Sequence, residues 1–207
     1  MRFRAGTAAA FEIELELLLD WYWPALKGAP CPPAVREEFR ALWSGVLDQL
    51  LALPGAWFLR DFHSPNLIWL PERHGVARVG ILDFQDALNE HAAFDLVSLL
   101  QDARIDVPAA LERDLFHYYC ARAQEQEAGF DRAAFAAAYA MFGAQRNTRL
   151  LGLWGATVAA RRQVTLSPAY STHMGISRPQ PWRCGHGRAR AMVCSSFPPH
   201  LRAGLPG

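Results

Sequence analysis

Several absences narrow what this 207-residue chain can be. No apolar run reaches the roughly 18 residues that a membrane-spanning helix needs. The N-terminus, Met1-Arg2-Phe3-Arg4, carries positive charge, but no apolar stretch of the kind found in secretory signals follows it. No Cys-x-x-Cys pair occurs among the four cysteines, a pattern that favours reduced thiols over a disulfide framework. We therefore expect a cytoplasmic protein without a membrane partner.

Negative charge is missing from the last third of the chain. Residues 1–131 hold all 20 carboxylates and 11 Lys and Arg, a net charge of −9, whereas residues 132–207 hold ten Arg, a net charge of +10. Residues 164–207 also contain six of the fourteen prolines and show no periodic pattern. This basic, Pro- and Arg-rich tail is predicted to be disordered or derived from a reading-frame shift.

Two functional interpretations of the tail, nucleic-acid binding and a zinc site, have less support than disorder or a reading-frame shift. Its arginines are scattered without interleaved aromatic residues, so a nucleic-acid partner is not expected. A zinc site is disfavoured as well, because the candidate ligands match no common ligand spacing; they are Cys184, His186, Cys194 and His200.

The body of the chain, residues 1–163, is predicted to be mostly α with a small β insert. Residues 8–27 alternate apolar and acidic side chains, which suits a strand, but their Ala, Glu and Leu content favours a helix. Trp57 and Trp69, in two of the predicted strands, and the aromatic residues of 116–119 are expected in the core. The expected helices are 8–27, 33–53, 92–103, 108–128 and 131–162, and the expected strands are 56–59, 66–70 and 77–82.

Three oxygen-bearing side chains carry a recognisable chemistry. Asp61 and Asn66 lie five residues apart, so they can bracket one loop, and Asp83 follows the apolar run Ile81-Leu82. Phosphoryl transfer needs a carboxylate that orients the attacking hydroxyl and hard oxygen ligands for Mg²⁺. Mg²⁺ usually takes only one or two protein carboxylates, so one Asp and one Asn are sufficient.

The same segment resembles a known family. The D-x-x-x-x-N spacing of Asp61 and Asn66, with Asp83-Phe84 in place of Asp-Phe-Gly, matches the kinase catalytic loop. The chain is similar in sequence to the aminoglycoside phosphotransferase superfamily, with its choline kinase-like members, over about residues 9–162. The similarity is carried by the segments RDFHSPNLIWLPER, VGILDFQDAL and FDLVSLLQDAR. It is closest to the branch of bacterial N-acetylmuramate/N-acetylglucosamine anomeric kinases. The resemblance implies the C-terminal lobe of a protein-kinase-like fold.

The resemblance also implies roles for single residues. Asp61 would be the catalytic base, and Asn66 and Asp83 would be the Mg²⁺ ligands. His63 would either shape the loop or lie near the phosphates. The acceptor would be a small metabolite, most simply an amino sugar, with ATP as co-substrate.

Four further residues are assigned supporting roles. Gln85 and Asp86 are expected on the substrate side or in the loop, although solvent exposure is an equal alternative. Arg60 is expected to be structural. Asp95 would anchor the loop in the related kinases, and its simplest interpretation from the sequence alone is an N-terminal helix cap.

The nucleotide clamp of a kinase is the part that the sequence does not supply. Phosphoryl transfer uses a lysine on the phosphates and a Gly-rich covering loop. The one lysine, Lys27, follows Pro24 at a predicted helix end, and no Gly-x-Gly-x-x-Gly precedes it. We therefore expect a truncated lobe with weak or absent turnover. The alternative is a non-catalytic lobe that binds a partner or self-associates through an exposed apolar face.

Overall fold

The computed structural model describes residues 8–85 and 87–165, with side chains up to residue 159. It is mostly helical with a small antiparallel β region, as expected from the sequence. The described chain divides into two compact units, one formed by residues 48–144 and the other by residues 8–47 and 145–165. The long helix α6 (Arg132–Thr165) contributes to both. No described helix is long and apolar enough to cross a membrane.

The tail predicted over residues 164–207 falls almost wholly outside the described residues. Helix α6 extends through Val164 and Thr165, the first two residues of that tail. Residues 166–207, which include the candidate zinc ligands, are not described. Disorder or a reading-frame shift in the tail therefore stays a prediction.

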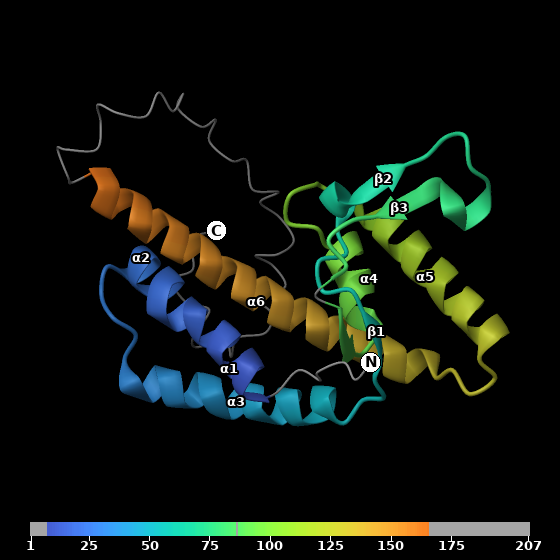
Figure 1. Ribbon diagram of the computed structural model, residues 1–207. Helices are drawn as coiled ribbons and strands as arrows, with labels where there is room; N and C mark the ends of the chain where they lie inside the picture. The colour runs from blue at the N-terminus through green and yellow to red at the C-terminus, as the bar shows by residue number, and fades with distance from the viewer. Residues whose placement is uncertain (1–7, 86, 166–207) are drawn as a thin grey trace. The chain divides into compact units, whose positions relative to one another are not determined.

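In its described part, the unit formed by residues 8–47 and 145–165 is built from helices (Figure 1). Its first helical run comprises α1 (Ala8–Leu17), the π-helical turn η1 (Leu18–Tyr22) and α2 (Trp23–Lys27), and it is followed by α3 (Pro33–Leu51). The helical interpretation of residues 8–27 is therefore confirmed. Its buried side chains recur with the period of a helix rather than that of a strand; they are Phe11, Leu15, Leu18 and Leu19.

The π-helical turn lies where α6 comes very close to the first helical run. A Cβ added to Gly152 would lie 2.5 Å from Leu17 Cβ, and one added to Gly155 would lie 2.5 Å from the Tyr22 backbone nitrogen. Real Cβ atoms essentially never approach so closely, so only glycine fits at either position. The two glycines of α6 thus permit direct backbone packing against η1.

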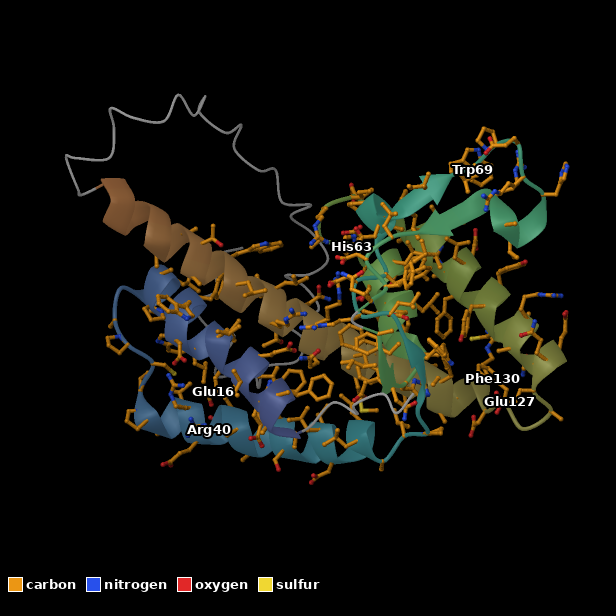
Figure 2. The ribbon with its side chains drawn as sticks, in the orientation of Figure 1. Glu16, Arg40, His63, Trp69, Glu127 and Phe130 are labelled. Carbon is orange, nitrogen blue, oxygen red and sulfur yellow. The ribbon has the colours of Figure 1, made fainter. Side chains whose placement is uncertain are left out.

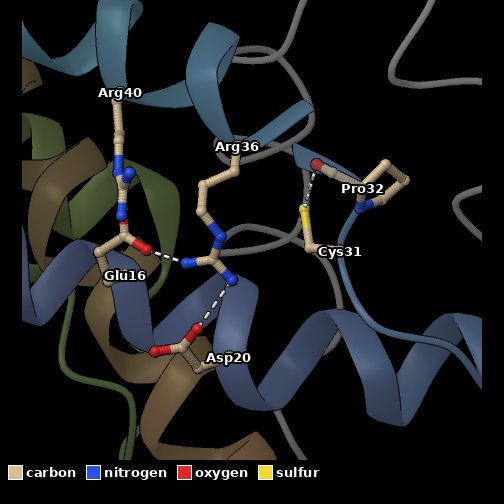
Figure 3. Close-up of polar contacts among 6 residues, drawn as sticks. All are labelled: Glu16, Asp20, Cys31, Pro32, Arg36 and Arg40. Atoms are coloured by element: carbon tan, nitrogen blue, oxygen red, sulfur yellow. Dashed lines mark hydrogen bonds and ion pairs between the residues drawn. The ribbon is translucent and has the colours of Figure 1, made fainter. Parts of the chain in front are cut away.

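Ion pairs join α1 and η1 to α3 (Figure 3). Arg36 pairs with Glu16 and with Asp20 Oδ1 at 2.8 Å, and Arg40 Nε lies 2.5 Å from Glu16 Oε1. Isolated surface pairs contribute little, but a network that shares one carboxylate fixes the helices more effectively. Close to it, Cys31 Sγ donates to the Pro32 carbonyl, and burial raises the pKa of the Cys31 thiol.

The unit formed by residues 48–144 packs α4 (Ala93–Leu100), α5 (Ala109–Gln126) and the start of α6 around aromatic rings. Phe94 is the centre of this core, with ring centroids 4.5 Å from Phe58 and 5.4 Å from Phe142. Tyr119 stacks on Phe135 at 5.0 Å. These contacts anchor α4, the helix that reaches the loop carrying Asp61.

Among the described residues of this unit, four short strands form two antiparallel pairs. β1 (Ala56–Phe58) pairs with β4 (Leu88–Glu90), and β2 (Leu67–Trp69) pairs with β3 (Val79–Ile81). Figure 1 shows β2 beside β3. Strand β4 was not predicted. The expectation that Trp57, Trp69 and Tyr118 lie in the core is wrong, because these residues are 69%, 61% and 66% exposed. Trp57 points away from the buried Phe58 on β1, and Trp69 lies on β2, a strand without a buried residue.

Candidate active site

The loop between β1 and β2 begins with a left-handed residue. Arg60 has φ = 71°, a conformation that costs a non-glycine residue roughly 1–2 kcal/mol. Two tight backbone hydrogen bonds follow, from Asp61 N to Leu59 O at 2.8 Å and from His63 N to Asp61 O at 3.0 Å. The reversal at Arg60 sets the direction in which the chain presents Asp61, which is half-buried.

Asp95, in the first turn of α4, binds the start of this loop. Its Oδ2 accepts a hydrogen bond from Leu59 N at 2.7 Å, and its Oδ1 accepts one from Arg60 N at 3.2 Å. Burial raises the pKa of Asp95 to about 6, and the charge of Asp61 acts in the same direction, while the two backbone donors oppose both effects. The strained backbone at Arg60 is therefore supported by a desolvated carboxyl group.

The first backbone amide of α4 is hydrogen-bonded to His91 rather than to Asp95. His91 Nδ1 accepts a hydrogen bond from Ala93 N, the first residue of the helix, at 3.2 Å. The simple interpretation of Asp95 as a helix cap is thus wrong, because both of its oxygens bond to the loop instead. Burial lowers the pKa of His91, which keeps the ring neutral and able to accept.

Asn66 ends a short 3-10 helix, η2 (Ser64–Asn66), immediately before β2. Its side-chain Nδ2 donates to the Asp61 carbonyl at 2.9 Å, across the loop. This bond fixes the orientation of the amide and leaves Oδ1 as the atom that can accept from, or coordinate, a ligand. The loop is therefore closed on itself between its first and last functional positions.

Asp83 lies at the same end of the β2–β3 hairpin as Asn66. The strand register pairs Leu67 with Ile81, and Leu82 N donates to Asn66 O at 2.9 Å, one residue before Asp83. Asp83 itself has φ = 57° and is exposed, with Gln85 Nε2 hydrogen-bonded to its Oδ1. Each predicted functional carboxylate therefore lies at or beside a left-handed residue other than glycine: Asp61 follows Arg60, and Asp83 is itself left-handed.

The other predicted site residues are placed as follows. His63 is buried at the N-cap position of η2, and Figure 2 shows it in the loop between the strands. Arg60 and Gln85 are exposed. Asp86 lies outside the described residues. Within residues 8–85 and 87–165, no three His, Cys, Asp or Glu side chains are grouped to hold a metal ion. A site of one Asp and one Asn would not form such a group.

Sequence reasoning missed one residue of this site. Asp102, just beyond the end of α4, has a fully buried side chain and bonds to the backbone of Ser64. No local pattern indicates this role, because Asp102 lies beyond the helical residues of α4 and its bond to Ser64 spans 38 residues.

The Asp-x-x-x-x-Asn loop beside a strand-end Asp, in a mostly helical chain, has the motif pattern of kinase-like phosphotransfer domains. Residues 4–136 match the model of the phosphotransferase enzyme family, and the chain belongs to that family. Its relatives include a protein of Caulobacter vibrioides described as an N-acetylmuramate/N-acetylglucosamine kinase, which is 38% identical over 143 residues. Proteins of Neisseria meningitidis and Pseudomonas putida with the same description are 32% and 29% identical.

These relatives are considerably longer than the chain. The matched regions cover 69%, 68% and 68% of this chain but only 38%, 41% and 41% of the Caulobacter, Neisseria and Pseudomonas proteins. Family membership therefore rests on the region that contains the loop and the hairpin.

Proposed function

We propose that this chain carries the phosphoryl-transfer site of a small-molecule kinase, with Asp61 as the base and Asn66 and Asp83 as the Mg²⁺ ligands. One observation carries the proposal. Hydrogen bonds from Asn66 Nδ2 to Asp61 O and from Leu82 N to Asn66 O connect these positions in an unbroken series. Residues 22 positions apart in the sequence are thereby tied into one local structure.

The chemistry assigned to Asp61 is proton acceptance and orientation. A hydroxyl of the acceptor would donate a hydrogen bond to the Asp61 carboxylate as its oxygen attacks the γ-phosphorus of ATP. The proton passes to Asp61 as the bond between the γ-phosphorus and the bridging oxygen breaks, which leaves ADP and the phosphorylated acceptor. Positioning of the hydroxyl supplies most of what the protein contributes to such a reaction.

The donor set suits Mg²⁺. Asp83 offers a carboxylate and Asn66 an amide oxygen, both hard ligands, and Mg²⁺ leaves its other positions to phosphate oxygens and water. When bound, the ion neutralises charge on the phosphates. The bond from Asn66 Nδ2 to the Asp61 carbonyl points the amide oxygen away from that carbonyl, so that the oxygen stays available as a ligand.

The acceptor is proposed to be an amino sugar. The support is the description of three relatives as N-acetylmuramate/N-acetylglucosamine kinases, at 29–38% identity over two thirds of this chain. The proposed partners are thus a small-molecule acceptor and ATP, in a cytoplasmic setting.

Turnover by this polypeptide alone is proposed to be weak or absent. A kinase uses a lysine to pair with the α- and β-phosphates. The single lysine, Lys27, lies at the end of α2, where its ammonium group is 5.9 Å from the Trp23 ring centroid. A lysine at a helix end, followed by a left-handed Gly28, is placed as a C-terminal helix residue rather than as a phosphate ligand.

A phosphorylation assay tests the proposal. Purified full-length chain is incubated with Mg²⁺, γ-labelled ATP and either N-acetylglucosamine or N-acetylmuramate, beside the Asp61→Asn variant. We expect the rate of phosphoryl transfer by the chain to exceed that of the Asp61→Asn variant by no more than about tenfold. In an efficient enzyme, loss of a general base usually lowers the rate by more than this. Transfer far above background that Asp61→Asn abolishes would support the site but contradict the weak turnover. Strong transfer that Asp61→Asn leaves unchanged would overturn the assignment of the base.

A non-catalytic binding module is the second candidate. Large apolar side chains are exposed over β2, β3 and the turn that follows, which is unusual for a surface without a partner; they are Ile68, Trp69, Val79, Ile81, Leu82 and Phe84. Oligomers in gel filtration that persist regardless of Mg-ATP would favour this candidate. A monomer that binds Mg-ATP would favour the enzyme.

A further inference from the structure

Asp102 and Asp95 bond to different residues of the loop between β1 and β2. The side chain of Asp102 is fully buried, and its Oδ2 accepts a hydrogen bond from Ser64 N at 3.3 Å. Asp95, by contrast, bonds to the backbone of Leu59 and Arg60. Two carboxylates from the α4 segment therefore hold the two ends of the same loop.

The Ser64 amide is a donor that the turn cannot satisfy by itself. In η2, the Asn66 and Leu67 amides bond to the carbonyls of His63 and Ser64. Pro65 has no amide hydrogen, so the first turn leaves the Ser64 amide as its donor. His63, at the N-cap position, makes no capping bond with its side chain. Asp102 supplies the acceptor from 38 residues away.

We propose that Asp102 is a second positioning residue, which acts as a long-range cap of η2 and thereby places the Asn66 amide for the metal ion. The proposal rests on the function proposed above. Asn66 ends the turn that Asp102 caps, and its side chain bonds to the Asp61 carbonyl. Loss of the cap frees the turn to unwind, and the Asn66 side chain then loses the backbone that aims it.

A local role of Asp102 must be separated from this one. Its Oδ1 also accepts from Arg104 N at 3.0 Å, a turn that ends the α4 segment, with Arg104 Nη1 at 3.8 Å. The substitution Asp102→Asn removes one of the two acceptor oxygens and keeps the volume. Because the turn to Arg104 is local, we expect the substituted side chain to keep that bond and to lose the bond to Ser64.

Amide hydrogen exchange on the full chain tests the proposal, measured for Asp102→Asn, wild type and the charge-matched Asp106→Asn. Asp106 is exposed a few residues further along the same connection. We expect exchange of the Ser64, Asn66 and Leu67 amides to accelerate about tenfold or more in Asp102→Asn, the effect of losing one charge-assisted hydrogen bond. Asp106→Asn should leave these amides unchanged.

Equal exchange of these three amides in Asp102→Asn and wild type would overturn the proposal. Faster exchange confined to the Arg104 amide would also overturn it, because the role of Asp102 would then be local. Failure of the proposed function is a separate result. It would appear as an Asn66 side-chain resonance that does not respond to Mn²⁺ in the wild type, whatever the amide exchange shows.

Discussion

Asp95 combines two properties that usually exclude each other, a desolvated carboxyl group and a structural role that benefits from its charge. Burial raises its pKa to about 6, with Asp61 contributing in the same direction. Its two oxygens nonetheless accept from two successive loop amides, one of them at the left-handed Arg60. Ionised Asp95 therefore orders the loop at neutral pH at a cost to the stability of the fold.

The folded state should lose stability relative to an Asp95→Asn variant as pH rises from about 4 to about 6. Over that range folded Asp95 keeps a proton that the unfolded chain, with a pKa near 3.8, has released, so the unfolded state binds fewer protons. The free energy of unfolding of the wild type should fall against that of Asp95→Asn by on the order of 2–3 kcal/mol. Denaturant titrations followed by tryptophan fluorescence at pH 4.5 and 7.5 measure this difference.

A suitable control is Asp114→Asn, which removes an exposed carboxylate of α5. It should leave the pH dependence of stability close to that of the wild type. A difference between wild type and Asp95→Asn that is the same at both pH values would contradict the buried state of Asp95.

Among the elements, the first helical run shows which local structure a sequence pattern predicts and which it does not. Its apolar residues alternate, but helix propensity outweighs the alternation, and the buried positions Phe11 and Leu15 are four residues apart. No propensity indicates the π-helical turn at Leu18–Tyr22, which coincides with the close approach of α6. The sequence pattern of one segment carries no information on such a contact between distant segments.

Alanine at Gly155 should destabilise the unit that contains η1. The added Cβ would lie 2.5 Å from Tyr22 N and 2.7 Å from Trp21 C, both backbone atoms that cannot rotate away. We expect a loss of about 1–3 kcal/mol in the free energy of unfolding, which denaturant titration measures. Gly45→Ala is the matched control, since Gly45 lies inside α3 with nothing within 4 Å. It should gain up to about 1 kcal/mol, and an equal gain at Gly155 would contradict the packing.

The helices and the site motif were predictable from the sequence, whereas the supports of the site were not. The Asp61-to-Asn66 spacing and Asp83 at a strand end were visible because they are local. Strand β4 was missed because Leu88–Glu90 is three residues long and its pairing with β1 is non-local. The bonds of Asp95 and Asp102 span 36 and 38 residues, a separation that one sequence cannot resolve.

At the scale of the whole chain, the described residues hold the proposed base, its two proposed metal ligands and the carboxylates that support their loop. The matched region spans 38% of the length of the Caulobacter relative. The central claim concerns the local assembly, that Asn66 and Asp83 share one divalent cation beside Asp61. It can be tested on this polypeptide whether or not it turns over.

The most direct test is a Mn²⁺ titration of chain labelled with ¹⁵N at asparagine side chains, in the presence of ATP. The chain has three asparagines, Asn66, Asn89 and Asn147, so the spectrum contains three pairs of side-chain NH₂ resonances. Mn²⁺ occupies oxygen sites suited to Mg²⁺ and broadens nearby resonances. We predict that the Asn66 pair broadens first, and that Asp83→Ala abolishes this selectivity. Equal broadening of all three pairs, or an unaffected Asn66 pair, would contradict a shared cation site.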